Sequence, residues 1–268
     1  MIDIRADRPK KGRGAQANRT GRHEPLQTIA INDGWDLDED DLPPLRTTVT
    51  NETCRTAITY NKSPDLPFDR SINPYRGCEH GCAYCYARPS HANMGLSPGL
   101  DFESRLFAKT NIVEALERDL RKPGYRCRGI MIGANTDPYQ PIERAHRLTR
   151  QVLEVLSTYQ HPVAIVTKSD QVLRDLDLLG PMAAKGLAAV AVSVTTLDRH
   201  LSRKLEPRAP TPEKRLQAIR ELNRAGVPVS VFASPMIPFL NDAELETIIK
   251  AGVDAGAVSA SYILLRLS

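Results

Sequence analysis

The sequence predicts an α/β fold in which a parallel sheet is covered by helices. Three observations predict it: short apolar runs recur from residue 72 onward, longer segments of helical period separate them, and helix start and stop signals lie between them. Apolar strands joined by helical crossovers are typical of parallel sheets. The pattern leaves two architectures open, a doubly wound open sheet and a full or partial barrel.

Six segments, most of them apolar, are predicted strands: 72–76, 128–133, 162–167, 188–194, 227–233 and 259–265. Helices are predicted between them, near 83–90, 142–158, 170–179, 212–225 and 242–254. Asp170 and Thr211-Pro212 favour helix starts, and Ala225-Gly226 favours a stop. An additional strand and helix are expected at 104–121. No helix covers the last strand, which is an awkward ending for a barrel, so we expect the protein to continue past Ser268.

Composition places the chain among soluble globular proteins. Its 268 residues are 41% hydrophobic and 25% charged, with a mean hydropathy of −0.35. No window approaches the ~18 continuous apolar residues of a spanning helix, and the charged N-terminus lacks the apolar core of a secretory signal. We therefore expect a cytoplasmic protein with no membrane partner. A net charge of +4 is too small to argue for a nucleic-acid partner by itself.

Residues 1–55 are predicted to form a mobile charged extension, and residues 56–268 the folded core. Residues 1–25 contain seven Lys or Arg and three acids, and residues 33–41 contain six acids. Charge blocks of this kind seldom fold, which favours a solvated tail over a nucleic-acid-binding arm. Residues 12–17 match G-x-G-x-x-A, but no strand precedes them and no periodic helix follows, so we reject a dinucleotide-binding role.

The strongest motif is C-x3-C-x2-C, formed by Cys78, Cys82 and Cys85 directly after the first predicted strand. Thiolates bind zinc, copper(I) or iron–sulfur clusters. Closed structural sites use four protein ligands, so three cysteines indicate a metal left open to an exogenous ligand. The alternative is a zinc knuckle completed by His80 or His91.

Other residues receive structural predictions. Cys54 and Cys127 are expected to be inert, because small apolar residues of this kind are common in protein cores. Glu206 and Arg215 are expected to form a structural ion pair. The basic segment 199–215 fits either a phosphate-binding surface or a solvated loop.

The form C-x3-C-x-aromatic-C, with Tyr84 as the aromatic residue, resembles the signature of radical S-adenosylmethionine (SAM) enzymes. The resemblance implies a [4Fe-4S] cluster on the three cysteines, with its remaining iron chelated by SAM. It implies that one-electron reduction cleaves SAM to a 5′-deoxyadenosyl radical, which abstracts hydrogen from a substrate. It also implies a partial (β/α)6 barrel, in agreement with the six predicted strands.

Further segments resemble the bacterial branch related to spore photoproduct lyase, whose members are often labelled DNA repair photolyases. These segments are Tyr84-Cys85-Tyr86 and residues 135–141, 167–169 and 205–207, within a similarity that runs from about Ser63 to the C-terminus. The resemblance implies one catalytic residue, Tyr86, as a radical relay. It implies five cofactor-binding residues: Tyr84, Thr136, Asp137, Lys168 and Ser193. Two alternatives stay open, that Asp137 caps a helix or braces a turn and that Lys168 is merely solvated.

One departure bears on the reaction. Spore photoproduct lyase uses a cysteine near the end of its second strand as a hydrogen donor, and residues 133–136 contain none. Repair of thymine dimers by that route is therefore not expected. The resemblance favours DNA or RNA as the first substrate class to test, leaves activases and peptide modifiers open, and implies a one-electron donor such as flavodoxin or ferredoxin. The alternative function is a non-catalytic iron–sulfur or zinc protein that binds nucleic acid.

Overall fold

The computed structural model describes residues 10–25 and 45–266 of the chain. In this part, strands form a larger sheet in the order β10-β9-β8-β7-β6-β3-β2 and a smaller one in the order β1-β5-β4. The strands are β1 (Thr48–Glu52), β2 (Thr59–Tyr60), β3 (Arg70–Ile72), β4 (Tyr75–Arg76), β5 (Arg105–Lys109), β6 (Ile130–Ile132), β7 (Val163–Thr167), β8 (Ala188–Ser193), β9 (Val229–Met236) and β10 (Ser259–Leu264).

Helices connect most of these strands. The α-helices are α1 (Asp101–Ser104), α2 (Ile112–Leu120), α3 (Glu143–His146), α4 (Leu148–Thr158), α5 (Leu176–Ala184), α6 (Arg199–Leu205), α7 (Pro212–Arg224) and α8 (Leu245–Asp254). The 3-10 helices are η2 (Arg88–Met94), η3 (Asp170–Asp175) and η4 (Asp242–Glu244). Among the helices of the described residues, none combines the length and the apolar composition that a bilayer-spanning segment needs.

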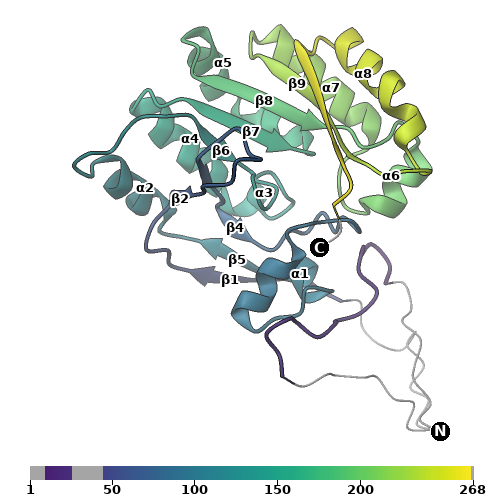
Figure 1. Ribbon diagram of the computed structural model, residues 1–268. Helices are drawn as coiled ribbons and strands as arrows, with labels where there is room; N and C mark the ends of the chain where they lie inside the picture. Colours follow the sequence, from purple (N-terminus) through teal and green to yellow (C-terminus); the bar gives the residue numbers. More distant parts are fainter. Residues whose placement is uncertain (1–9, 26–44, 267–268) are drawn as a thin grey trace, which may run out of the picture.

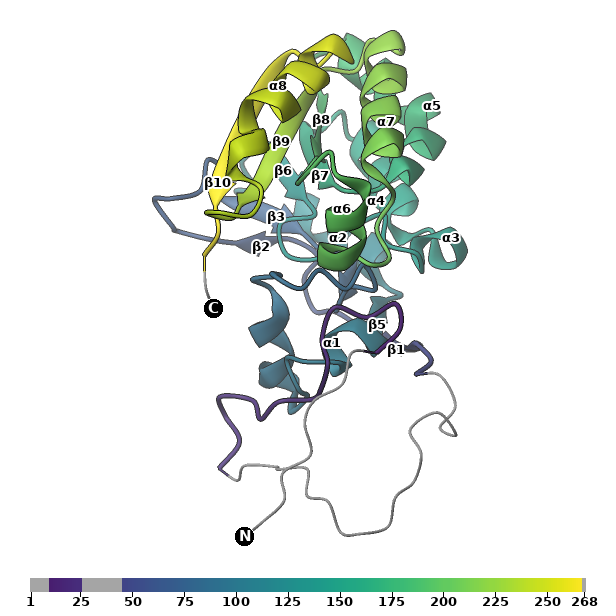
Figure 2. The same cartoon turned by 90° about the vertical axis from the view of Figure 1, so that its right-hand side faces the viewer.

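The larger sheet decides between the two predicted architectures. From β3 through β10 its strands are parallel and lie in the order of the sequence. Right-handed crossovers between strands taken in order place their helices on one side of a sheet. Helices α5 and α7 pack against β8, and α7 and α8 against β9 (Figures 1 and 2). This arrangement confirms the α/β prediction and is a partial barrel, with β10 and β2 at the edges of the sheet.

The strands of the larger sheet are less evenly buried than their sequences predict. In β7, Val163 and Ile165 are buried, whereas Ala164 and Val166 between them are half-buried. In β8 the exposed position is Ala189, again a small apolar residue. The sequence shows continuous apolar runs because the less buried face carries small apolar residues as well.

Two predicted elements differ from the structure near the cysteines. The strand expected at 72–76 is divided: Ile72 pairs with Ile132 in the larger sheet, whereas Tyr75 pairs with Ala108 in the smaller one. Pro74 lies between them and has no N–H to continue a ladder. The helix expected at 83–90 is wrong, because turns with i→i+3 hydrogen bonds lead directly into η2. The chain therefore changes sheets and enters a compact loop at the cysteines.

The predicted N-terminal extension is packed against the core wherever the structure describes it. Strand β1 pairs in parallel with β5. Residues 10–25 lie beside α1, drawn in dark purple in Figures 1 and 2. The rest of the predicted extension, residues 1–9 and 26–44 with the acidic run at 33–41, lies outside the described residues.

Candidate metal centre

The three motif cysteines lie in residues 77–88, here called the cysteine loop, which follows β4. Cys78 and Cys82 are buried and Cys85 is half-buried. Cys78 forms a small apolar cluster with Ala87 and Phe102, and Cys85 packs against it. Gly77, with a φ of 73°, turns the chain into the loop in a conformation that residues with a Cβ rarely adopt. The loop therefore carries three largely buried thiols, two of which share this apolar cluster.

The thiols lie where a cation would stabilise their charged form. Burial raises the pKa of each of the three, and raises that of Cys82 to about 12. The nearby Lys168 ammonium acts in the opposite direction on Cys82 and Cys85. Bound iron adds positive charge and favours the thiolate. These residues thus fit a cationic metal centre, since a bound metal would offset the cost of desolvating them.

Each histidine of the zinc-knuckle alternative has a ring contact of its own, but among the described residues the buried Nδ1 atoms of both form no hydrogen bond. His80 Nδ1 lies 3.4 Å from the Asp137 carboxylate. His91 Nε2 lies 3.0 Å from the Arg105 carbonyl oxygen, and its ring meets Phe102 edge-on. Across residues 10–25 and 45–266, no three His, Cys, Asp or Glu side chains converge on a position for one metal ion. A [4Fe-4S] cluster does not require its ligands to meet at one ion, because each thiolate binds a different iron.

Gln140 holds the main chain on both sides of Cys78. Its Nε2 donates to the Gly77 carbonyl at 3.0 Å, and its Oε1 accepts from the Glu79 N–H at 2.9 Å. The side chain is completely buried, so these main-chain groups have no water to replace it. Gln140 follows β6, and through it the end of one parallel strand fixes the orientation of a cysteine. The sequence contains this residue in a motif but gives no sign of the contact.

We expect Gln140→Leu to weaken metal binding more than it weakens folding. Loss of the two hydrogen bonds leaves buried polar groups unsatisfied, at about 1–3 kcal/mol each, and contacts of this kind typically alter metal affinity about 10–100-fold. Iron and sulfide content after anaerobic reconstitution, together with urea unfolding of the metal-free protein, measures both effects.

The matched control for this substitution is Gln171→Leu. Gln171 also donates to a main-chain oxygen of the 137–143 segment, that of Tyr139 at 3.1 Å, but among the described residues it forms no hydrogen bond with the cysteine loop. We expect it to change stability alone. Equal iron content in the Gln140→Leu, Gln171→Leu and wild-type proteins would contradict the role given to Gln140.

Asp137 joins the ends of β6 and β7. Its Oδ1 accepts from the Thr167 hydroxyl at 2.7 Å, and its Oδ2 accepts from the Lys168 N–H at 2.8 Å. Burial acts to raise the pKa of Asp137, but His80 and these hydrogen bonds outweigh it and hold the pKa at about 2. The neighbouring Thr136 hydroxyl donates to the Tyr75 carbonyl at 3.0 Å. Asp137 Oδ1 also accepts from the Tyr139 N–H at 2.9 Å, which braces the turn as in the alternative left open above. Cofactor binding by Thr136 and Asp137 stays a prediction.

Tyr84 is anchored by a buried polar network at the ends of β8 and β9. Its hydroxyl donates to Glu206, which pairs with Arg215. The Thr195 hydroxyl donates to the same carboxylate at 2.7 Å. Lys168 Nζ lies 5.8 Å from the centre of the Tyr84 ring. The structure therefore brings together Tyr84 and Lys168, both predicted cofactor-binding residues, and confirms the ion pair between Glu206 and Arg215.

Tyr86 and Ser193, the remaining predicted site residues, differ in their exposure to solvent. The Tyr86 side chain is exposed, and its hydroxyl donates to the Ala134 carbonyl just beyond the end of β6. Ser193 is buried at the end of β8, where its carbonyl accepts from Arg215 at 3.2 Å. Cys127 is exposed before β6, at the opposite end of that strand from the cysteine loop. The predicted catalytic tyrosine thus lies beside the segment that lacks a cysteine.

Known proteins resemble the chain over most of this core. A family model described as the radical SAM superfamily matches residues 72–251. An uncharacterized protein of Mycobacterium tuberculosis is 34% identical over 261 residues, which cover 90% of this chain and 76% of that protein. A Pseudomonas phage M6 protein, named radical SAM Nα-GlyT isomerase, is 26% identical over 166 residues, covering 62% of this chain and 32% of that protein.

Solved structures show the same fold. A variant of spore photoproduct lyase superposes with a TM-score of 0.62 at 16% identity, covering 82% of this chain and 63% of that one. Another variant, with bound AdoMet and dinucleoside spore photoproduct, gives a TM-score of 0.61 at 17% identity and the same coverage. The chain thus spans less than two thirds of the length of these lyase structures. At this identity the likeness concerns the fold, and it confirms the expected partial-barrel core.

Proposed function

The chain belongs to the radical SAM superfamily, and from that premise we propose that Cys78, Cys82 and Cys85 hold a [4Fe-4S] cluster beside which the enzyme binds SAM. When bound, these groups supply one-electron cleavage of the sulfonium and a 5′-deoxyadenosyl radical for hydrogen abstraction. The observation that carries the proposal is a loop with three largely buried thiols at the carboxyl edge of a parallel sheet.

The residues around the loop support distinct roles. Lys168 closes β7 and places an ammonium group near the Tyr84 ring, where it suits the carboxylate of SAM as a point-charge partner. Tyr84, fixed by Glu206 and Thr195, orients the loop between the second and third cysteines. Tyr86 has an exposed ring at the end of β6, and we propose it as the residue that relays hydrogen or a radical. Thr136, Asp137 and Ser193 complete the proposed SAM site.

We propose nucleic acid as the substrate class, with a small electron-transfer protein such as flavodoxin or ferredoxin as the donor. Helix α6 supports the choice of substrate, because it exposes Arg203 and Lys204 and is tied to the cysteine loop by a 2.9 Å hydrogen bond from the Ala83 N–H to the Leu205 carbonyl. Exposed basic residues beside a site suit a phosphate backbone. The lack of a cysteine at 133–136 argues against repair by the route of spore photoproduct lyase.

The test is anaerobic reconstitution with iron and sulfide, followed by electron paramagnetic resonance of the dithionite-reduced protein with and without SAM. We expect a [4Fe-4S]+ signal that SAM alters, and formation of 5′-deoxyadenosine. DNA and RNA oligonucleotides added to the same assay should raise that formation if either is the substrate. Bound zinc, or a signal that SAM leaves unchanged, would instead favour a non-catalytic metal protein.

A further inference from the structure

We infer that residues 10–24, here called the N-terminal strap, hold the cysteine loop in its ligating conformation and shield one side of it, with Glu103 and Gly14 as the positioning residues. The inference rests on the proposed function, because it assigns the strap a role toward the metal centre. Nothing in the sequence pattern of the strap indicates this contact. It follows from four sets of contacts among the described residues.

A buried carboxylate joins the strap to the core. Glu103 in α1 is completely buried. Its Oε2 accepts from the Gly14 N–H at 3.0 Å, and its Oε1 accepts from the Ala15 N–H at 2.7 Å. A carboxylate is seldom buried without several donors, so the strap is part of what makes this burial possible.

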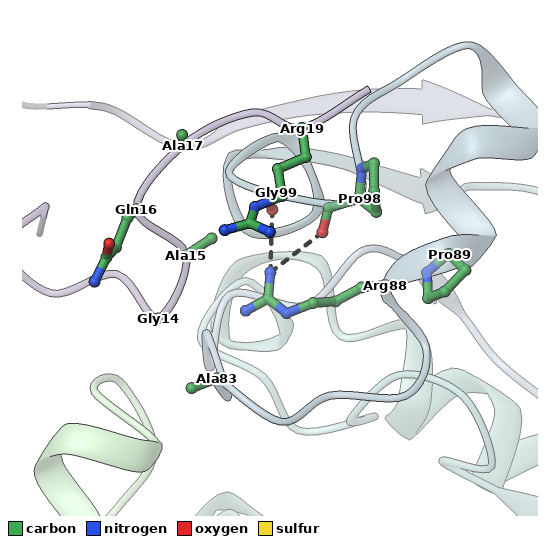
Figure 3. A pocket seen from close by; sticks show the side chains of 10 residues that line it. All are labelled: Gly14, Ala15, Gln16, Ala17, Arg19, Ala83, Arg88, Pro89, Pro98 and Gly99. Atoms are coloured by element: carbon green, nitrogen blue, oxygen red, sulfur yellow. Dashed lines mark hydrogen bonds between the residues drawn. The ribbon is translucent and has the colours of Figure 1, made fainter. Parts of the chain in front are cut away.

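Arg88 links the same carboxylate to Cys82, one of the three proposed cluster ligands. Arg88 Nη2 lies 2.5 Å from Glu103 Oε1 and also donates to the Cys82 carbonyl at 2.8 Å. Arg88 Nη1 donates to the Gly99 carbonyl at 3.0 Å, one of the contacts drawn in Figure 3. The strap, Glu103 and Arg88 thus form a continuous polar path to the peptide of Cys82. A shift of the strap would therefore move the main chain of Cys82.

The strap also touches the cysteine loop directly. A Cβ placed on Gly14 would lie 1.8 Å from the Gly81 carbonyl oxygen and 3.1 Å from the Ala83 nitrogen. Contacts that short exclude any side chain, so glycine is required for the two main chains to lie side by side. Beyond this contact, the strap and the cysteine loop line a pocket of about 550 Å³, which Figure 3 shows between Ala15, Arg88 and Gly99.

Further anchors fix the strap on both sides of Gly14. The buried Arg13 donates to the Glu103 carbonyl at 2.7 Å and to the Leu45 carbonyl at 2.9 Å. At the other side, the Ser97 hydroxyl donates to the Arg19 carbonyl at 2.6 Å. A segment held in this way orders the loop beneath it and keeps water from the groups that it covers.

The test compares Gly14→Val with Gln16→Ala, a control at an exposed strap residue that only lines the pocket. The first readout uses the metal-free protein: the rate at which N-ethylmaleimide labels Cys82 and Cys85, measured by mass spectrometry. The exposed Cys127 serves as internal reference. We expect Gly14→Val to speed labelling about tenfold, because buried thiols react through local opening, and Gln16→Ala to match the wild type.

The second readout is the bleaching of the reconstituted protein in air, which Gly14→Val should accelerate severalfold. Glu103→Gln, a variant with no added bulk, should act in the same direction. Circular dichroism shows whether the variants remain folded. Folded Gly14→Val and Glu103→Gln proteins with wild-type labelling and bleaching rates would overturn the inference. A wild-type protein that takes up no iron and sulfide would defeat the proposed function alone, since the labelling contrast does not require a cluster.

Discussion

Replacing Cys82 with alanine should abolish 5′-deoxyadenosine formation and lower the iron and sulfide content well below that of the wild type. Cys82 is buried, and the charges of Lys168 and Glu206 both act on the pKa of its thiol, in opposite directions. Alanine offers no ligand there, and the loop provides no fourth cysteine to take its place. Loss of residues around metal ligands typically weakens binding about 10–100-fold, so loss of a ligand itself should exceed that range.

The chain provides a matched control in Cys127. It is exposed, whereas the loop thiols are buried or half-buried, and it lies at the other end of β6. Cys127→Ala should therefore retain wild-type iron content, electron paramagnetic resonance and SAM cleavage. A Cys82→Ala protein that still cleaved SAM at the wild-type rate would show that the three cysteines do not form the reactive centre.

The βα units were predictable because their signals are local. Thr211 and Pro212 mark the start of α7 as predicted, and Gly226, with a φ of 73°, follows its end. The split between β3 and β4 lies at Asn73 and Pro74, which interrupt the segment 72–76. The proline signals a break, but it does not show that the two halves join different sheets. Strand boundaries of this kind depend on which partner strands are available, and these lie far away in the sequence.

In the candidate site, too, the local features could be predicted from the sequence and the long-range contacts could not. The spacing of three cysteines identified the loop, since ligands this near in sequence can wrap one centre without help from the rest of the fold. The residues that hold the loop were missed: Gln140 lies 62 positions from Cys78, and Glu103 binds the main chain of Gly14 at a separation of 89. Their contacts go to main-chain groups, which every residue has, so no complementary side chain marks them. Only the topology brings them together.

The strap has no apolar pattern, so its sequence predicts a mobile extension. Its charges predict solvation when hydrophobic burial is the only criterion. The structure instead secures it through Arg13, which is buried, and through the main chain of Gly14 and Ala15. Hydrogen bonds to a buried carboxylate replace the apolar contacts on which sequence reasoning relies.

Arg215→Met should destabilise the metal-free protein by about 3–5 kcal/mol, the usual effect of leaving a buried charge without its partner. Arg215 and Glu206 are both almost completely buried. Methionine fills much of the same space, so the loss of stability comes mainly from the buried Glu206 carboxylate, which no longer has a cationic partner. Tyr84 and Thr195 bind that carboxylate, so the effect should extend to the cysteine loop and reduce iron uptake. Urea unfolding at neutral pH measures the change in the free energy of unfolding.

The pH dependence of the free energy of unfolding distinguishes loss of the buried ion pair from loss of packing around Arg215. Burial acts to raise the pKa of Glu206, but Arg215 and Lys168 outweigh it and hold the pKa at about 2, below the usual 4.5. In the wild type, the stabilisation by the ionised carboxylate is complete above pH 4.5 and is lost as the pH falls toward 2. In Arg215→Met the carboxylate loses its partner and protonates more readily. The difference in the free energy of unfolding between the wild type and Arg215→Met should therefore become smaller as the pH is lowered.

Two further variants test whether the effect belongs to the pair. Arg224→Met removes an exposed arginine from the end of α7, where it pairs with Glu221 at the surface, and surface pairs contribute at most about 1 kcal/mol. The double variant Glu206→Gln with Arg215→Met removes both charges and should be more stable than Arg215→Met alone, because no unpaired charge remains buried. If Arg215→Met were no less stable than Arg224→Met, the buried pair would not be what holds Tyr84 and the cysteine loop against the sheet.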